Sequence, residues 1–279
     1  MFKLPELMYQ TFTNSHNGYG DVRSISAIER PVIENFLRSA YDASSATLTI
    51  VGDVDSVDLA SIMPIEFGDR DVSRPVHAEA EPPLVSRTGS RYDSVANADR
   101  VAIGFEVPGP LEGLPAYVSA VLLTEVLDSF THLLADDARI LGRGRWRTGR
   151  NGSPFDQVGP GLVAVDLECA TGSSPEVLVR EVQAALNSLP DDPGFRHSVQ
   201  AAQREAQMAL LVDLDNLLSV ASWTAVGSAL FGNANHQWEM SKLLMKTPYE
   251  AVAQTARLLA RGSRVWLASR GLRDHGDGR

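Results

Sequence analysis

The feature that most restricts the fold is a change of hydrophobic period between residues 99 and 122. In the first part every second residue is apolar, which predicts a strand with one buried face: Val101, Ile103, Phe105 and Val107. From Leu114 onward apolar residues recur at intervals of three and four, which predicts a long amphipathic helix continuing through Phe130. A strand followed by such a helix is compatible with an α+β arrangement, in which helices pack on a sheet.

The rest of the chain mixes strands and helices without regular alternation. Further strands are predicted at 47–51, 162–170 and 265–268, and the second of these is polar on one face. Helices are predicted at about 26–41, 175–189, 195–230 and 248–260. Because hairpin-like and helix-pair segments interrupt any βαβ order, the pattern favours an α+β sandwich over a doubly wound nucleotide fold.

Two distant regions of the chain repeat one pattern. A helix that begins at Pro31 is followed 16 residues later by a strand sequence at Thr47, and a helix that begins at Pro248 is followed 16 residues later by one at Arg264. The two regions therefore resemble the ends of similar units. Between them, residues 64 to 98 carry four prolines among scattered charges and no sustained period, which predicts a connector and a domain boundary.

Charge and cysteine content exclude several classes of protein. The chain has 25 basic and 35 acidic side chains, and a net charge of -10 disfavours binding to nucleic acid. The single cysteine, Cys169, has no partner for a disulfide, so a reducing compartment fits and we expect a cytoplasmic protein. Nowhere do eighteen apolar residues follow one another, and we expect neither a signal peptide nor a membrane span.

The residue types needed for catalysis do not converge in the sequence. The six histidines are dispersed, and the closest approach to a zinc motif, His236-Gln-Trp-Glu239-Met240, has a thioether where a second ligand is needed. We interpret this segment as the start of a surface helix. Cys169 lies inside a strand pattern without an adjacent histidine and is expected to be a small core residue. No metal or cofactor is therefore expected in this chain.

Arginines concentrate in one segment, 139–150, which holds five of them and Trp146 within twelve residues. Guanidinium groups bind carboxylates, phosphates or peptide carbonyls through forked hydrogen bonds, and an indole offers a flat apolar surface with one N–H donor. The alternative is a solvated loop, over about 142–153, whose arginines pair with nearby acids. Nucleic-acid binding through this short segment is a weaker third alternative, and salt-sensitive retention on DNA or RNA would test it.

Taken together these segments resemble the insulinase-like M16 metallopeptidases, in particular their M16B-type members. The segment from His16-Asn-Gly-Tyr-Gly20 through a helix to Leu48-Thr-Ile-Val-Gly-Asp53 is similar to the second half of that family's first domain. The segment Ala98-Asp-Arg-Val-Ala-Ile-Gly-Phe-Glu-Val-Pro-Gly109 is similar to the opening of the second domain, and Val265-Trp-Leu-Ala268 to its close. The resemblance extends over nearly the whole chain and its motifs are loose hydrophobic patterns.

The resemblance implies an M16-like α/β sandwich with one complete domain preceded by a partial one. On this reading residues 1–75 are the second half of the N-terminal domain, 76–98 a connector and 99–279 the C-terminal domain. The half that carries the family's HxxEH zinc helix has no counterpart here. In paired-subunit members the zinc-free subunit supplies an Arg and a Tyr seven residues later to the substrate. Arg139 and Trp146 have that spacing and are the predicted substrate-binding residues.

The leading hypothesis is therefore a non-catalytic subunit without activity of its own. It would help an HxxEH-bearing M16-like partner, which would hold the zinc, to bind and process a peptide. The alternative is a scaffold or peptide-binding module with no part in catalysis. Half a domain leaves a sheet edge to be covered, so an obligate partner or self-association is expected.

Overall fold

The computed structural model describes residues 3–16, 20–41, 46–56, 58, 61, 80–92, 98–130, 134, 139–141, 144–149, 154–155 and 157–271. The chain forms two compact units, each made of segments that are distant in the sequence. The first comprises Met1–Asn17, Glu79–Gln207 and Lys242–Arg279, and the second comprises Gly18–Ala78 and Met208–Ser241.

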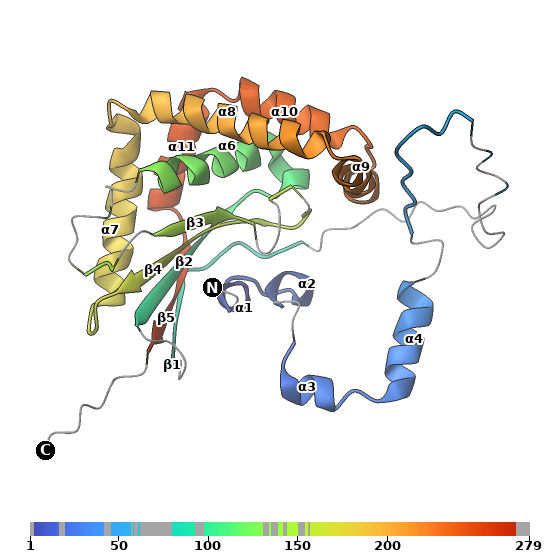
Figure 1. Cartoon of the computed structure of the whole chain (residues 1–279). Coiled ribbons are helices and arrows are strands. Elements are labelled where there is room, and N and C mark those ends of the chain that lie inside the picture. Colours follow the sequence, from blue (N-terminus) through green and yellow to red (C-terminus); the bar gives the residue numbers. More distant parts are fainter. Residues whose placement is uncertain are drawn as a thin grey trace, which may run out of the picture. The chain divides into compact units, whose positions relative to one another are not determined.

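The first unit is built on a five-stranded sheet in the order β1-β5-β2-β4-β3 (Figure 1). The strand bounds are Arg87–Tyr92 for β1, Asp99–Val107 for β2, Arg145–Thr148 for β3, Gly161–Cys169 for β4 and Arg264–Arg270 for β5. β1 runs parallel to β5, and the other neighbours are antiparallel. The strand predicted through Val101 and Val107 is thus confirmed as β2. The strands predicted at 162–170 and at 265–268 are confirmed as β4 and β5.

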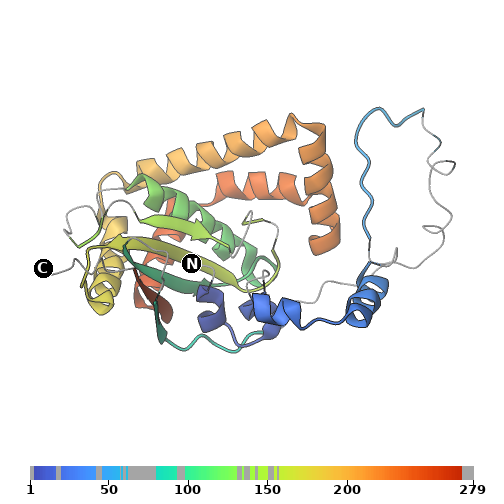
Figure 2. The same cartoon turned by 60° about the horizontal axis from the view of Figure 1, so that its bottom comes forward.

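Three helices cover one face of this sheet (Figures 1 and 2). They are α6 (Pro110–Ser129), α7 (Pro175–Ser188) and α11 (Tyr249–Arg261). The Ser174 side chain accepts a hydrogen bond from the Val177 N–H and caps α7, as the sequence predicted. α6 is long and apolar enough to cross a membrane by composition, but most of that helix is buried in the core. This buried helix accounts for the change from a two-residue to a helical period of apolar residues that follows β2 in the sequence.

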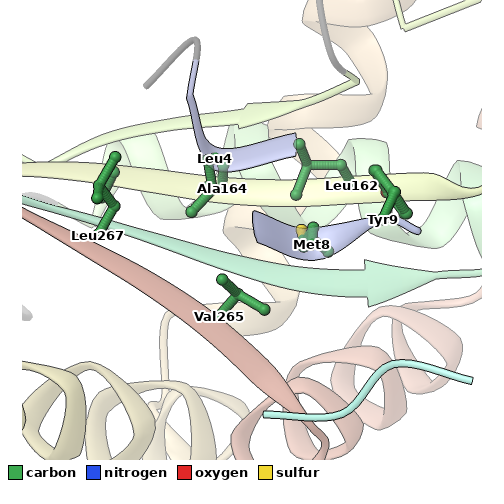
Figure 3. Close-up of a cluster of buried hydrophobic side chains, with 8 residues drawn as sticks. Leu4, Met8, Tyr9, Leu162, Ala164, Val265 and Leu267 are labelled. Carbon is green, nitrogen blue, oxygen red and sulfur yellow. The ribbon is translucent and has the colours of Figure 1, made fainter. Parts of the chain in front are cut away.

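The opposite face of the sheet is covered in its middle by α1 (Leu4–Met8), which is followed by α2 (Phe12–Ser15). Leu4 and Met8 are buried against the small residues of β2 and β4 (Figure 3). The approach is close, because a Cβ added at Gly104 would lie 2.8 Å from the Met8 Sδ atom. The polar face expected for residues 162–170 is therefore apolar and dry at its N-terminal end, where Leu162 and Ala164 are fully buried.

A second helical layer follows α7 along the chain. After a short 3₁₀ turn, η3 (Leu189–Asp191), α8 runs over Phe195–Leu214 and α10 over His236–Lys246. The buried Gln203 amide donates to the Leu244 and Thr247 carbonyls, both at 2.8 Å. These carbonyls lie at the end of α10, where helical partners are missing, so Gln203 serves as a side-chain cap.

The second unit contains mainly helices. α3 (Val22–Ser26) is capped by Asp21, α4 spans Arg30–Ala40, and α9 spans Leu217–Phe231. Asn216 is the N-cap of α9, and its side chain accepts hydrogen bonds from the Leu218 and Ser219 amides. None of the residues of α4 is buried, although the helix is strongly amphipathic.

Several local predictions were wrong. The helix expected over 26–41 begins only at Arg30, as α4, after the separate short helix α3, and the helix expected over 195–230 is split into α8 and α9. At the break between α8 and α9 the Asn216 side chain accepts hydrogen bonds from the first amides of α9 and so starts a new helix inside an apolar pattern that continues across the break. Residues 47–51 are described but belong to none of the strands in the described part of the chain.

The two segments expected to be irregular each contain an edge strand. β1 lies within the predicted connector 76–98, and β3 lies within the predicted loop 142–153. Their sequences, Arg-Thr-Gly-Ser-Arg-Tyr and Arg-Trp-Arg-Thr, are polar because an edge strand needs little apolar surface. The domain boundaries at residues 75 and 98 stay a prediction.

Candidate ligand-binding face of the sheet

Beyond α1, the face of the sheet opposite the three helices carries charged side chains. Strand alternation places Arg100 of β2, Asp166 and Glu168 of β4, and Arg145 and Arg147 of β3 on this face. We call these five residues the charged face. The residues that alternate with them point to the opposite face of the sheet, and these residues, such as Val101 and Val165, are buried under the helices. The alternation of β4 therefore presents charge and apolar surface on opposite sides of one strand.

Arg100 forms ion pairs with both acidic residues of the charged face, Asp166 and Glu168. The Arg100 Nη2 atom lies 3.4 Å from Glu168 Oε2, and its Nη1 atom lies 3.9 Å from Asp166 Oδ2. In the register Arg100 stands directly opposite Glu168, and Asp166 stands opposite Arg145. Arg145 and Arg147 have no ion pair with the other described residues, although Asp166 stands opposite Arg145.

A cavity of about 450 Å³ opens beside β3 at this end of the sheet. It is lined by Arg100, Asp128, Leu141, Gly144, Arg145, Asp166 and Glu168. Its walls thus combine acidic and basic groups with little apolar surface. Such a lining suits a polar ligand that carries both donors and acceptors.

Asp128 of α6 closes part of the outer edge of β3. Its Oδ1 atom accepts a hydrogen bond from the Trp146 N–H at 3.2 Å. Burial raises the pKa of the Asp128 carboxyl, and the hydrogen bond from Trp146 counteracts part of that rise. Because this N–H is already occupied, a peptide strand added to the edge of β3 would find one fewer free donor there.

The structure does not bring the two predicted substrate-binding residues together. Arg139 forms an ion pair with Glu181 of α7, with 3.3 Å between Nη2 and Oε1. Trp146 is 9% exposed and lies on the helix side of β3. The Arg139 carbonyl accepts from the Ala170 N–H, whereas Trp146 stands opposite Val165. Five residues of a strand separate these positions, which is about 17 Å at ~3.4 Å per residue.

Sequence reasoning missed the charged face as a unit, although its signals were present. The arginine-rich segment pointed to residues 145 and 147, and the polar positions of the strand 162–170 pointed to Asp166 and Glu168. What the sequence did not show was that Arg145-Trp-Arg147-Thr pairs with that strand. The motif residues 17–19 fall outside the described residues. The roles of Arg139 and Trp146 stay a prediction.

The described part of the chain holds no group of three or more His, Cys, Asp or Glu side chains placed to bind a metal ion. The segment His236–Met240 does begin a helix, α10, but His236 is buried and stacks on Phe231, with 3.7 Å between ring centroids. Burial lowers the pKa of His236. A ring enclosed in this way is a packing residue, so these residues do not fit the family's zinc site.

Cys169 has the environment expected of a core residue. It is 2% exposed at the end of β4. Burial raises the pKa of its thiol to about 11, which leaves almost no thiolate at neutral pH. The prediction that Cys169 is a small core residue is confirmed.

Comparison with known proteins shows which fold this arrangement belongs to. The sequence matches no protein-family model and no curated protein. Its fold is similar to that of a Helicobacter pylori protease, with a TM-score of 0.70, 14% identity and coverage of 96% of this chain and 65% of the other. It is also similar to an M16 inactive domain from Pseudomonas fluorescens, with a TM-score of 0.70, 13% identity and coverage of 98% of this chain and 64% of the other. For an M16-like peptidase from Alicyclobacillus acidocaldarius the TM-score is 0.64, with 16% identity and coverage of 97% of this chain and 65% of the other.

The chain therefore has the M16-like peptidase fold, and the predicted α+β sandwich of that type is confirmed. It spans about 65% of the length of these neighbours. At these identities the likeness establishes the fold and not the chemistry. The M16B subtype stays a prediction.

Proposed function

We propose that this chain is a non-catalytic subunit of a heteromeric M16-like zinc metallopeptidase. The supporting observation is an M16-like fold, shared with a domain described as inactive, in which the described residues offer no zinc ligand cluster. A zinc ion held by an HxxEH-bearing partner would supply the activated water for peptide hydrolysis. The part of this chain would be to bind the peptide next to that partner.

The residues of the charged face suit this task. They present guanidinium and carboxylate groups around a cavity of about 450 Å³. Arg139 would add a donor for a substrate carbonyl after release from Glu181, since that ion pair is exposed and weak. Trp146 would act through its packing, by holding β3 against α6.

The direct test is co-expression with an M16-like subunit that carries HxxEH. We expect a stable complex with one zinc per heterodimer, peptidase activity in the complex, and neither zinc nor activity in this chain alone. Arg139→Ala should lower turnover of the complex by an order of 10²-fold, as found for donors that stabilise a developing oxyanion. One zinc per chain in the isolated protein, or chelator-sensitive cleavage by it, would refute the proposal.

A scaffold without any role in substrate binding is the second candidate. It is favoured by one observation: Arg139 is ion-paired and Trp146 is buried, so neither presents its polar group freely to a ligand. The variant Arg139→Ala/Trp146→Ala separates the candidates. Normal assembly with unchanged turnover favours the scaffold, whereas normal assembly with reduced turnover favours peptide binding.

A cytoplasmic location belongs to the same proposal and is supported by the single, buried cysteine. Fractionation of cells that produce the chain from its own promoter tests it. Recovery of the protein in a periplasmic or membrane fraction would contradict this location.

A further inference from the structure

One group on the charged face lacks the partner that its burial requires. The Nε and Nη2 atoms of Arg147 are buried and have no hydrogen-bond partner in the described part of the chain. These two nitrogens form one side of the guanidinium, which is the side that binds a carboxylate through two parallel hydrogen bonds. Buried donors are almost always paired, so an unpaired fork calls for an explanation.

The surroundings of Arg147 do not supply that partner. It stands opposite Ala164, which belongs to the apolar cluster under α1. The charge that acts on it is Asp166, which lies 3.9 Å from Arg100 and makes no direct ion pair with Arg147. Burial lowers the pKa of Arg147 and Asp166 opposes this effect, so the guanidinium stays charged at neutral pH without a direct ion pair.

The adjacent arginine points in the same direction. Arg145 lies two residues along β3 on the same face of the sheet, about 7 Å away at ~3.4 Å per residue, and lines the 450 Å³ cavity. It has no ion pair within the described ranges. Two cations without direct counterions thus lie side by side in a protein of net charge -10. An anionic ligand would complete both.

We propose that Arg145 and Arg147 bind a carboxylate of a peptide on the charged face, through the free fork of Arg147 and the charge of Arg145. The proposal rests on the peptide-binding function above and adds the chemical class of the recognised group. The carboxylate would approach through the cavity that Arg145 lines, and the buried fork of Arg147, which does not line that cavity, would have to rotate to meet it. The carboxylate comes from an Asp or Glu side chain or from a peptide C-terminus.

The substitution Arg147→Met separates binding from folding. Methionine keeps the long stem of the side chain and removes the buried charge, and replacing an unpaired buried cation by an apolar group is neutral or stabilising. We therefore expect the Tm of Arg147→Met to equal or exceed that of the unmodified chain. Arg147→Lys retains charge without the fork and should bind as weakly as Arg147→Met. Arg204→Met on α8, an exposed arginine, is the matched control.

The first measurement uses sodium acetate against sodium chloride at equal ionic strength. The unmodified chain and Arg204→Met should show a rise in Tm with acetate concentration, and Arg147→Met should show none. Equal acetate effects in all three proteins, or no effect in any, would overturn the proposal, and so would a lower Tm of Arg147→Met in chloride. This measurement does not depend on peptide binding.

The second measurement uses fluorescein-labelled octapeptide pools with randomised uncharged residues and an amidated C-terminus. We expect a pool with one fixed Glu to bind at least about tenfold more tightly than the same pool with Gln, and Arg147→Met to remove the difference. A Gln pool with a free C-terminus distinguishes the terminal carboxylate as the source. Binding of both amidated pools with equal affinity overturns the carboxylate site and leaves the peptide-binding function standing. If no pool binds while acetate acts through Arg147, the peptide-binding function fails and the carboxylate site stands.

Discussion

The α11–β5 region and the region of α4 with residues 47–51 carry the same sequence pattern and reach different structures. In each, a proline near the start of an amphipathic helix precedes a strand-like sequence by 16 residues. β5 is an inner strand of the sheet, and α11 buries its apolar face. α4 has no buried residue, and residues 47–51 pair with no strand within the described ranges.

The difference shows that the local sequence pattern favours a helix or a strand, and that neighbouring elements decide whether a strand forms and is buried. β5 has β1 and β2 as partners on its two edges and α1 above it. The alternating residues Leu48 and Ile50 are instead exposed. A short apolar alternation becomes a strand only where a second strand supplies its hydrogen bonds.

The largest expected effect contrasts leucines on the two helices. Leu259 of α11 is 4% exposed, whereas Leu37 of α4 is 48% exposed. Leu259→Ala should lower the free energy of unfolding by about 2–5 kcal/mol, because it removes buried methyl groups and leaves a cavity. Leu37→Ala should change it by less than about 0.5 kcal/mol.

Urea denaturation followed by circular dichroism measures both variants. Leu258→Ala is the matched control, since this neighbour of Leu259 on the same helix is 61% exposed. A Leu37→Ala loss as large as that of Leu259→Ala would mean that α4 is packed in solution and would remove the contrast between the two regions.

A smaller effect is expected for Glu81, whose carboxylate is hydrogen-bonded to the residues around the start of α2. The Glu81 carboxylate accepts hydrogen bonds from the Gln10 N–H, from Thr11 and from the Asn14 amide, at the start of α2. Burial raises the pKa of Glu81, but these hydrogen bonds together lower it below the ordinary value of 4.5. Glu81→Gln should cost about 1 kcal/mol at pH 7.

The pH dependence of this variant has a definite sign. A carboxyl whose pKa is lowered by folding stabilises the protein fully above its unfolded pKa, and this stabilisation is lost as the pH falls through the folded value. The difference between the unmodified chain and Glu81→Gln should therefore shrink when the pH is lowered from 7 to below 4.5. A gap that widens in acid would contradict the assignment.

The core of the first unit could be predicted because its elements carry strong periodic signals. β2 alternates over nine residues and α6 follows it with apolar residues on most sides, so both were found at nearly their true bounds. The edge strands could not be found in this way. β1 and β3 are short and polar, and their position depends on pairing with β5 and β4.

The candidate site was visible only in fragments. The sequence marked an arginine-rich segment and, separately, two acidic positions in a strand. Their meeting depends on the register that places Arg145 opposite Asp166, which is a tertiary property. The family resemblance selected Arg139 and Trp146 by their spacing of seven residues. That spacing does not reveal that the two residues lie beside positions of β4 and its end, Ala170 and Val165, that are five residues apart.

The smallest effect on stability is expected for the apolar face of α4. Ile33 and Phe36 are 47% and 59% exposed, so the variant Ile33→Ser/Phe36→Ser should change the free energy of unfolding by less than about 0.5 kcal/mol. If an HxxEH-bearing partner completes this region, the same variant should weaken the complex. Hydrogen exchange of the amides of residues 47–51 should be fast in the chain alone and at least about tenfold slower in the complex, because pairing removes them from water. Amides that stay unprotected in the complex, together with unchanged affinity of the variant, would show that the partner binds elsewhere and that the contrast between the two regions persists after assembly.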